Sequence, residues 1–407
     1  MGALKERKAA KLQPNISVKN HFFFMMAVFC FWFAIYIYAP VFGVYLQSIG
    51  FTYSAIGIIL GSYGITQILL RFPFGILSDL LQGLRKHLLV AGFVMALISS
   101  LLLIYFHSFV MVLIARLLAG ITASMWVMAT VLYSQYFITS RASQAMGILQ
   151  FLTVAAQFIS MAISGYLVAL FGWNFPFWVG VAVSLLGAFF AWSIKEVESQ
   201  EDKAFFNISL HIKETFLMPH LKMITVLSLI AHAILFITIF GFTPIYAVRL
   251  GAEEKSLLWL TCAFFIPHAL SSLWLVFYKL NVRYNKLVLM SSFGVTSIFL
   301  FIVPFSKSLI SISWVHAAIG LSLGFVFPLL LSQVVQISPG EIKMSAMGFY
   351  QSFYALGIFS GPIMGGEIAE RIGLNEVFFF AGILSLIAAM LVLFQSVGKE
   401  GSRARSL

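Results

Sequence analysis

The chain carries one pattern twice: residues 145–177 read AMGILQFLTVAAQFISMAISGYLVALFGWNFPF, and residues 346–378 read AMGFYQSFYALGIFSGPIMGGEIAERIGLNEVF. The two segments align without a gap. The residues shared are Ala145, Met146, Gly147, Gln150, Phe158, Gly165, Gly172, Asn174 and Phe177, which recur as Ala346, Met347, Gly348, Gln351, Phe359, Gly366, Gly373, Asn375 and Phe378. A repeat of this length indicates that the two halves of the chain are copies of one structural unit.

The composition is that of a membrane protein. Hydrophobic residues make up 61% of the 407 residues and charged residues only 10%, whereas soluble domains are about half apolar and about a quarter charged. Both cysteines, Cys30 and Cys262, lie in apolar runs, so neither a disulfide framework nor a metal cluster is expected. The apolar run from Phe22 is longer than a signal-peptide core, and we expect it to be retained as a first span.

Twelve apolar runs are long enough to cross a membrane, because about 17–25 helical residues span the hydrocarbon core. The expected spans are 22–46, 55–78, 87–107, 109–137, 145–170 and 174–194, then 223–248, 256–278, 286–304, 309–336, 345–369 and 375–396. The repeated segments fall on the fifth and eleventh spans, so the two units have the same orientation. The sequence predicts an all-α membrane protein with a six-helix bundle at 1–195, a cytoplasmic linker at 196–222 and a second six-helix bundle, related to the first by a pseudo-twofold axis, at 223–407.

Lys and Arg are concentrated on one side of the expected spans, which carries the N-terminal tail, the central linker and the C-terminal tail. The opposite side holds only Arg249, Lys255, Lys307 and Arg371. The positive-inside rule therefore places both termini in the cytoplasm of a protein of the plasma (inner) membrane. Basic loops facing an anionic leaflet explain the net charge of +11, so no nucleic-acid partner is expected.

Several motifs resemble those of the major facilitator superfamily. The loop after the second span matches that family's cytoplasmic signature at Gly75, Leu77, Asp79, Gly83, Arg85 and Lys86. Arg116 and Gly120 in RLLAG are spaced as in its fourth-span signature, and GIFSGPIMGG in the eleventh span is similar to a signature of its drug antiporters. The resemblance covers nearly the whole chain. It implies a monomeric secondary transporter with alternating access, a small-molecule substrate and no cofactor.

The signature loop is expected to act as a conformational latch. Its members are Gly75, Asp79, Gly83, Arg85 and Lys86. A short basic loop can place cations at helix ends and pair with Asp79, and so hold one half against the other in one state.

Arg71 lies deep in the second span, on one helical face with Tyr63 and Gln67. A charge near the bilayer centre costs roughly 2.5 kcal/mol or more, so this stripe must face protein or water. Two interpretations stay open. Arg71 extends toward Asp79 and belongs to the latch, or it is a cation inside a cavity that binds the negative end of a substrate.

Three residues are candidates for proton coupling: Arg116, Glu367 and His232. The family resemblance implies a coupling role for Arg116 in the fourth span. Glu367, in the outer part of the eleventh span, is a carboxylate that could exchange a proton as a cavity opens to either side. Its alternative is an ordinary ion pair with Arg371, one helical turn away.

Histidines in the spans form a second group of proton-site candidates, because histidine titrates near neutral pH. They are His232, His268 and His316. His232 ranks first, since the seventh span is expected to line the cavity. The alternative for each is a hydrogen bond between helices.

Polar and aromatic residues on other spans complete the candidate substrate site. Gln150, Thr153 and Gln157 form a row on the fifth span. The full set of proposed substrate-binding residues is Arg71, Gln67, Tyr63, Tyr36, Trp126, Gln150, Gln157, His232, Phe236, Gln351 and Tyr354. Aromatic rings can cover the apolar body of a ligand, although packing is the alternative for many aromatics in a chain with 43 Phe.

Motifs for hydrolysis, metal binding and nucleotide binding are absent from the sequence, so we expect no enzyme and no metal site. Any uphill transport must then draw on an ion gradient. The leading prediction is proton-coupled efflux, by antiport, of a small amphipathic organic compound. Two deep arginines with few deep acids favour a neutral or anionic compound. The alternatives are an importer or exchanger of organic or inorganic anions clamped by Arg71, and a non-transporting receptor or lipid scramblase.

Overall fold

The computed structural model describes residues 16–77, 83–137, 142–196, 208–218, 220–278, 282–339 and 342–394. Within these ranges the chain is helical and contains no strand. The first half consists of α2 (Val18–Tyr36), α3 (Ala39–Ser48), α4 (Tyr53–Leu77), α5 (Arg85–Tyr105), α6 (Phe109–Ser124), α7 (Trp126–Ser134), α8 (Ala142–Phe171) and α9 (Phe175–Trp192). The rest consists of α10 (Ile208–Leu217), α11 (Leu221–Ile237), η2 (Thr238–Phe242), α12 (Thr243–Arg249), η3 (Glu254–Ser256), α13 (Leu257–Phe277), α14 (Val282–Ile302), η4 (Val303–Phe305), α15 (Leu309–Ile337), α16 (Lys343–Arg371) and α17 (Leu374–Phe394).

Eleven segments of the described chain are long and apolar enough to cross a membrane, which confirms the multi-pass architecture. The remaining expected span, the eleventh at 345–369, corresponds to α16, which has 29 residues but a more polar composition. Its position explains this difference. α16 packs between α4 and α11, and a helix enclosed by other helices is rich in small and polar residues rather than uniformly apolar.

The repeat is visible in the helices. The duplicated segments cover most of α8 and α16, which are both long helices, and continue into the starts of α9 and α17. The first span of each half is broken: α2 ends at Tyr36 before α3 begins at Ala39, and α11 ends at Ile237 before the π-helix η2. Ile37 and Thr238 are as far apart in the chain as Ala145 and Ala346, so the two breaks occupy equivalent positions. The expected spans 22–46 and 223–248 contained no such breaks.

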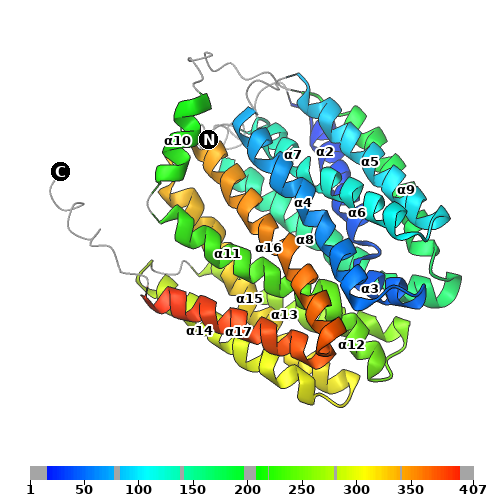
Figure 1. Ribbon diagram of the computed structural model, residues 1–407. Helices are drawn as coiled ribbons and strands as arrows, with labels where there is room; N and C mark the ends of the chain where they lie inside the picture. The colour runs from blue at the N-terminus through cyan, green and yellow to red at the C-terminus, as the bar shows by residue number, and fades with distance from the viewer. Residues whose placement is uncertain are drawn as a thin grey trace, which may run out of the picture.

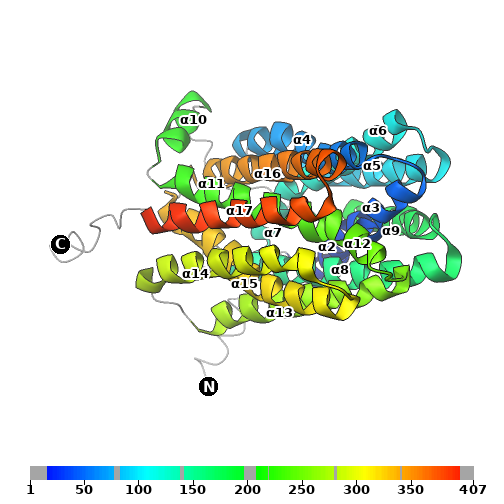
Figure 2. The ribbon, with the colours of Figure 1, turned by 60° about the horizontal axis from the view of Figure 1, so that its bottom comes forward.

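The two halves meet where α4 and α16 lie side by side (Figures 1 and 2). A Cβ added to Gly57 would lie 2.4 Å from the carbonyl oxygen of Pro362, and one added to Gly61 would lie 2.4 Å from that of Phe359. Gly357 faces α11 instead, where a Cβ would lie 2.1 Å from the carbonyl oxygen of Leu229. The small residues of these helices therefore allow backbones to approach closely on two faces of α16.

The halves close against each other at one end of the molecule. There α3 contacts η2 and α12, and Ser54 Oγ donates a 2.8 Å hydrogen bond to the carboxylate of Glu367. The backbone N–H of Tyr53 donates to Glu370 Oε2 over 2.8 Å. The central-segment helix α10 lies at the opposite end (Figure 1). In the predicted orientation, the closed end faces outward.

Candidate functional site

A cavity of about 490 Å³ lies between the two halves. Its wall is built from α2, α4, α7, α8, α11, η2, α13, α15 and α16. It extends to Gln150, Val335 and Met347, close to the ends of α8, α15 and α16 that lie opposite the closed end. Its volume falls in the range of about 300–1,000 Å³ that is usual for small-molecule sites.

All eleven residues predicted to bind substrate line this cavity: Arg71, Gln67, Tyr63, Tyr36, Trp126, Gln150, Gln157, His232, Phe236, Gln351 and Tyr354. They come from both halves of the chain, and the fold brings them together around one cavity. Their role in binding remains a prediction.

Arg71 is the charged residue of the cavity. Its side chain is 3% exposed. Its Nη1 donates a hydrogen bond of 2.5 Å to Tyr354 Oη, its Nη2 lies 3.4 Å from the carbonyl oxygen of Ala123, and its Nε has no hydrogen-bond partner among the described residues. Within the described chain no carboxylate pairs with it. A guanidinium has five N–H donors, so most of its capacity for hydrogen bonding is unused.

The position of Arg71 bears on the two interpretations of this residue. Asp79, the partner required by the latch interpretation, lies outside the described residues. The observed contacts of Arg71 are with Tyr354 and the cavity wall. This geometry favours the cavity interpretation.

Tyr354 connects Arg71 to His232. The phenol ring of Tyr354 lies parallel to the imidazole of His232, with 4.0 Å between centroids and 4° between planes. The Nδ1 of His232 is 2.8 Å from the backbone carbonyl oxygen of Ser228, which acts as acceptor, so Nδ1 carries the hydrogen and Nε2 is the nitrogen able to take a proton. Arg71, Tyr354 and His232 thus form one continuous group across the two halves.

The other two span histidines differ from each other. His268 lines the cavity, and its Nδ1 is buried without a partner. His316 is fully buried away from the cavity, with Nδ1 2.9 Å from the carbonyl oxygen of Ile312 and Nε2 3.1 Å from Thr243 Oγ1. His316 therefore forms a hydrogen bond between helices, which is the alternative to a proton site.

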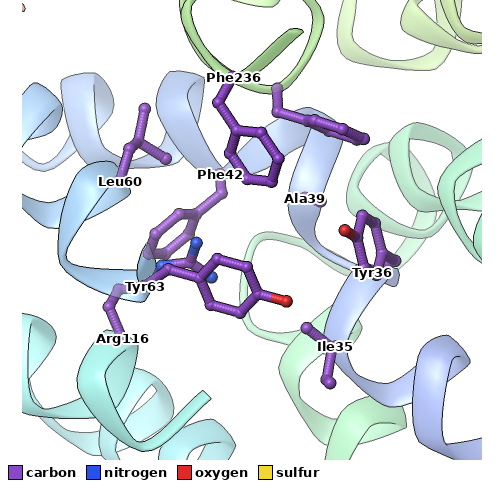
Figure 3. A pocket seen from close by; sticks show the side chains of 9 residues that line it. Ile35, Tyr36, Ala39, Phe42, Leu60, Tyr63, Arg116 and Phe236 are labelled. Carbon is purple, nitrogen blue, oxygen red and sulfur yellow. The ribbon is translucent and has the colours of Figure 1, made fainter. Parts of the chain in front are cut away.

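Arg116 does not reach the main cavity and instead lines a smaller hollow of about 20 Å³ (Figure 3). Its guanidinium carbon lies 4.7 Å from the ring centre of Tyr63, 5.2 Å from that of Phe42 and 5.9 Å from that of Tyr38. Nη1 is 3.3 Å from Tyr38 Oη, and Nε has no partner. The described residues supply no carboxylate to Arg116, so cation–π contacts take the place of an ion pair.

Glu367 lies at the closed end and does not line the cavity. Its carboxylate accepts hydrogen bonds from Ser54 Oγ and from Arg371 Nε, and its side chain is 45% exposed. This geometry is that of an ordinary ion pair with Arg371, which was the alternative to proton exchange for this residue. It also links α16 to α4 across the closure.

Residues of the predicted latch lie in different surroundings. Gly75 approaches the other half, since a Cβ on Gly348 would lie 3.3 Å from its Cα. The backbone N–H of Gly83 donates to Glu196 over 3.0 Å, and Lys86 Nζ lies 5.5 Å from the ring centre of Trp192. The first contact reaches the start of the central linker, and the second stays within the first half. Arg85 is buried, and the structure does not describe Asp79.

Several cavity residues were missed by the sequence analysis. They are Trp32, Thr130, Phe240, Phe264, Phe265, Phe327, Met347 and Tyr350. The repeat contains a signal for two of them. Phe264 and Phe327 lie as far beyond Tyr63 and Trp126 as Ala346 lies beyond Ala145, and His268 is related to Gln67 in the same way. Duplicated positions therefore face the same cavity from opposite sides.

The cavity combines one buried cation with a largely aromatic wall. None of its described lining residues is Asp or Glu. Such a site can bind the negative end of a ligand through a guanidinium fork and cover its apolar part with rings.

Comparison with known proteins gives a consistent picture. The model of the Major Facilitator Superfamily matches residues 24–341 and 250–406. An uncharacterized MFS-type transporter of Methanocaldococcus jannaschii is 22% identical over 388 residues, covering 92% of this chain and 97% of that protein. A probable sugar efflux transporter of Pasteurella multocida is 21% identical over 356 residues, covering 86% and 84%. The solved nucleoside transporter NupG superposes with a TM-score of 0.73 at 15% identity, covering 92% of this chain and 99% of that one, which shows the fold alone.

Proposed function

This chain belongs to the major facilitator superfamily, and we propose that it exports a small amphipathic organic compound, anionic rather than neutral, in exchange for protons. Members of this family are membrane transporters and not enzymes. The proposal adds the substrate class, the direction and the coupling ion to that assignment.

One observation carries the substrate class: Arg71 is buried in the cavity with no carboxylate partner among the described residues. A buried charge without a counterion is costly, and the cost is relieved when an opposite charge binds. A carboxylate, sulfonate or phosphate group would meet unused N–H donors there. The aromatic side chains around it, among them Trp126 and Phe236, suit an apolar body of the size of one or two rings.

Glutamines supply the remaining polarity. Gln150, Gln157 and Gln351 lie on α8 and α16, the two helices that contain the repeated segments. An amide side chain both donates and accepts, so these residues can bind hydroxyl or carbonyl groups of a ligand without a preference for charge.

For proton coupling we favour His232 over Glu367. His232 lines the cavity and is linked through Tyr354 to Arg71, so the proton and the ligand would occupy neighbouring positions of one cavity in turn, as exchange requires. Glu367 is engaged by Ser54 and Arg371 at the closed end. Among the described residues no carboxylate contacts Arg116, and its aromatic surroundings favour another role.

Alternating access would proceed by rocking of the bundle at 1–195 against the bundle at 223–407, with 196–222 as the linker. Opening of the closed end would separate Tyr53 and Ser54 from the two carboxylates of α16. The close backbone contacts of α4 and α16 would slide or part at Gly57 and Gly61. The predicted latch would form at the other end in the opposite state.

A thermal-shift experiment tests this proposal. Naphthalene-1-sulfonate and its uncharged analogue naphthalene-1-sulfonamide are added to the purified wild type and to Arg71→Gln. A ligand that binds only the folded protein stabilises it by about 2.7 kcal/mol at 100 times its Kd. We expect the sulfonate to stabilise the wild type more than the sulfonamide does, and Arg71→Gln to lose this difference. Equal stabilisation of both proteins by both compounds would contradict the proposed substrate class.

An anion importer or exchanger is the second candidate, because the same arrangement of Arg71 would serve it. Transport from vesicles with imposed pH gradients separates the two: an inward proton gradient should accelerate exit of the sulfonate if the protein is an antiporter. Ligand binding without any flux would favour a receptor, and movement of fluorescent lipid without a gradient would favour a scramblase.

A further inference from the structure

The hollow around Arg116 and the main cavity share part of their walls. Tyr36, Tyr63, Phe236 and Phe240 line both. The same four aromatic side chains therefore separate the two spaces. Arg116 lies on the side of this partition that is nearer the closed end. It is one turn before Gly120 on α6, and a Cβ added to Gly120 would meet the backbone of Tyr63.

The partition is built jointly by the two halves. Tyr63 of α4 stacks on Phe236 of α11, with 6.2 Å between centroids and 19° between planes. Tyr36 of α2 meets Phe240 of η2 edge-on at 5.5 Å. Each pair joins one half to the other, so separation of the halves at the closed end must pull both pairs apart.

Phe240 lies in the π-helix η2, where the regular helical hydrogen bonding of the seventh span is interrupted. Such interruptions are frequent at functional sites. Opposite η2, a Cβ on Gly43 would lie 3.1 Å from the carbonyl oxygen of Gly241, so α3 seats directly against this break. Movement at the closed end would act on Phe240 before it acts on the regular part of α11.

Arg116 is itself poised to bind. It is 6% exposed, its Nε has no partner, and its other contacts are one 3.3 Å hydrogen bond and three ring faces. Rings compensate a buried cation less completely than a counterion does. Arg71 reaches the carbonyl oxygen of Ala123, and Arg116 lies seven residues earlier on α6, which is about 10 Å along the helix axis. The two cations are thus stacked along the transport path on either side of the partition.

We propose that Arg116 is a second anion-binding station, closed off from the cavity by the aromatic partition and joined to it when the outer end opens. The inference rests on the proposed function, since it requires that Arg71 binds the same anionic group. As Phe236 and Phe240 leave with the second half, the hollow around Arg116 widens. The ligand's anionic group then passes from Arg71 to Arg116 and on to the outside.

The experiment measures exchange of radiolabelled naphthalene-1-sulfonate by the full chain, reconstituted in one orientation, with the concentration varied separately on each face. Arg116→Gln should raise the half-saturating concentration on the outer face about 10-fold, the value of one charge-assisted hydrogen bond, and leave the inner face nearly unchanged. Arg71→Gln should raise it on both faces. Arg249→Gln, which alters an exposed arginine at the end of α12, should raise it on neither.

Arg116→Lys provides a second variant that keeps the positive charge within the rings. It lacks the guanidinium fork, so the same one-sided effect should appear at smaller size. Equal effects on both faces for Arg116→Gln and Arg116→Lys would show that Arg116 only supports the packing, and would overturn the second station while leaving the proposed function intact. A wild type that neither binds nor exchanges the sulfonate would overturn the proposed function, and the second station with it.

Discussion

Arg71 Nη1, in the first half of the chain, donates a 2.5 Å hydrogen bond to Tyr354 Oη in the second half, and its guanidinium carbon lies 5.3 Å from the centre of the Tyr354 ring. The residue that we propose to bind a substrate anion is therefore also a contact between the two halves. A sulfonate or carboxylate is a stronger acceptor than a phenol. Binding of an anion would replace this contact and so loosen the junction in the cavity.

The charge of Arg71 should control affinity for anions. Arg71→Gln removes a charge-assisted interaction of about 1.5–3 kcal/mol, which corresponds to a loss of about 10- to 150-fold in affinity for naphthalene-1-sulfonate. Arg71→Lys should retain part of the affinity. Isothermal titration with the sulfonate and the sulfonamide provides the measurement, and Arg249→Gln is the matched control. If Arg71→Gln weakened both ligands equally, Arg71 would be structural.

Tyr354→Phe should have the opposite effect on affinity. It keeps the ring that stacks on His232 but removes the hydroxyl that accepts from Arg71. The ligand-free protein should lose about 1 kcal/mol of stability. The ligand-bound protein should lose less stability, because the anion has replaced the hydroxyl. Binding of the sulfonate should therefore tighten about threefold to fivefold, while the melting temperature of the empty protein falls. Tyr166→Phe, on an exposed position of α8, is the control. Weaker binding by Tyr354→Phe would mean that the hydroxyl orients Arg71 in the bound state.

The pH dependence of transport should follow His232. An imidazole that lines the cavity is able to exchange a proton when the cavity opens to water, so His232→Gln should flatten the pH profile of sulfonate exchange. Glu367→Gln should preserve the profile, because Glu367 lies outside the cavity. His107→Gln alters an exposed histidine between α5 and α6 and controls for surface effects. The reverse result, a flat profile only in Glu367→Gln, would assign coupling to Glu367.

Adding one methyl group between α4 and α16 should open the closed end. In Gly57→Ala the new Cβ would lie 2.4 Å from the carbonyl oxygen of Pro362, and overpacking of this kind destabilises the closed arrangement by about 1–3 kcal/mol. Spin labels at Ser48 and Glu253, which are exposed on opposite halves at this end, should report a longer distance in Gly57→Ala than in the wild type. Gly294→Ala has open space around its Cβ and should leave the distance unchanged. An unchanged distance in Gly57→Ala would show that the close contact does not hold the end shut.

Much of the fold could be predicted because lipid imposes a strict rule on sequence. Each span must be long and apolar, and the duplication at Ala145 and Ala346 fixes the relation between the halves. The break at Ile37 and its counterpart at Thr238 could not be predicted in the same way. A π-helix leaves the apolar pattern intact, and its position depends on packing against the neighbouring half.

The candidate site was easier to predict for polar residues than for aromatic ones. Arg71 and Gln67 are costly in a span, so their positions alone indicate a cavity. Phe264 and Phe327 carry no such signal, since a phenylalanine suits lipid, core and cavity equally well. Glu367 shows where this reasoning stops working. Near the end of a helix a charged side chain can form an exposed ion pair, so it does not carry the energetic cost of a charge inside the membrane, and its position does not indicate a cavity.

Counterflow tests the central claim most directly. Vesicles containing the wild type are loaded with unlabelled naphthalene-1-sulfonate and diluted into a trace of the labelled compound, with Arg71→Gln vesicles and protein-free vesicles alongside. An alternating-access carrier whose cavity binds anions through Arg71 should concentrate the label transiently in wild-type vesicles and not in the other two. Accumulation in wild-type vesicles no greater than in protein-free ones, or equal accumulation in Arg71→Gln vesicles, would contradict the account.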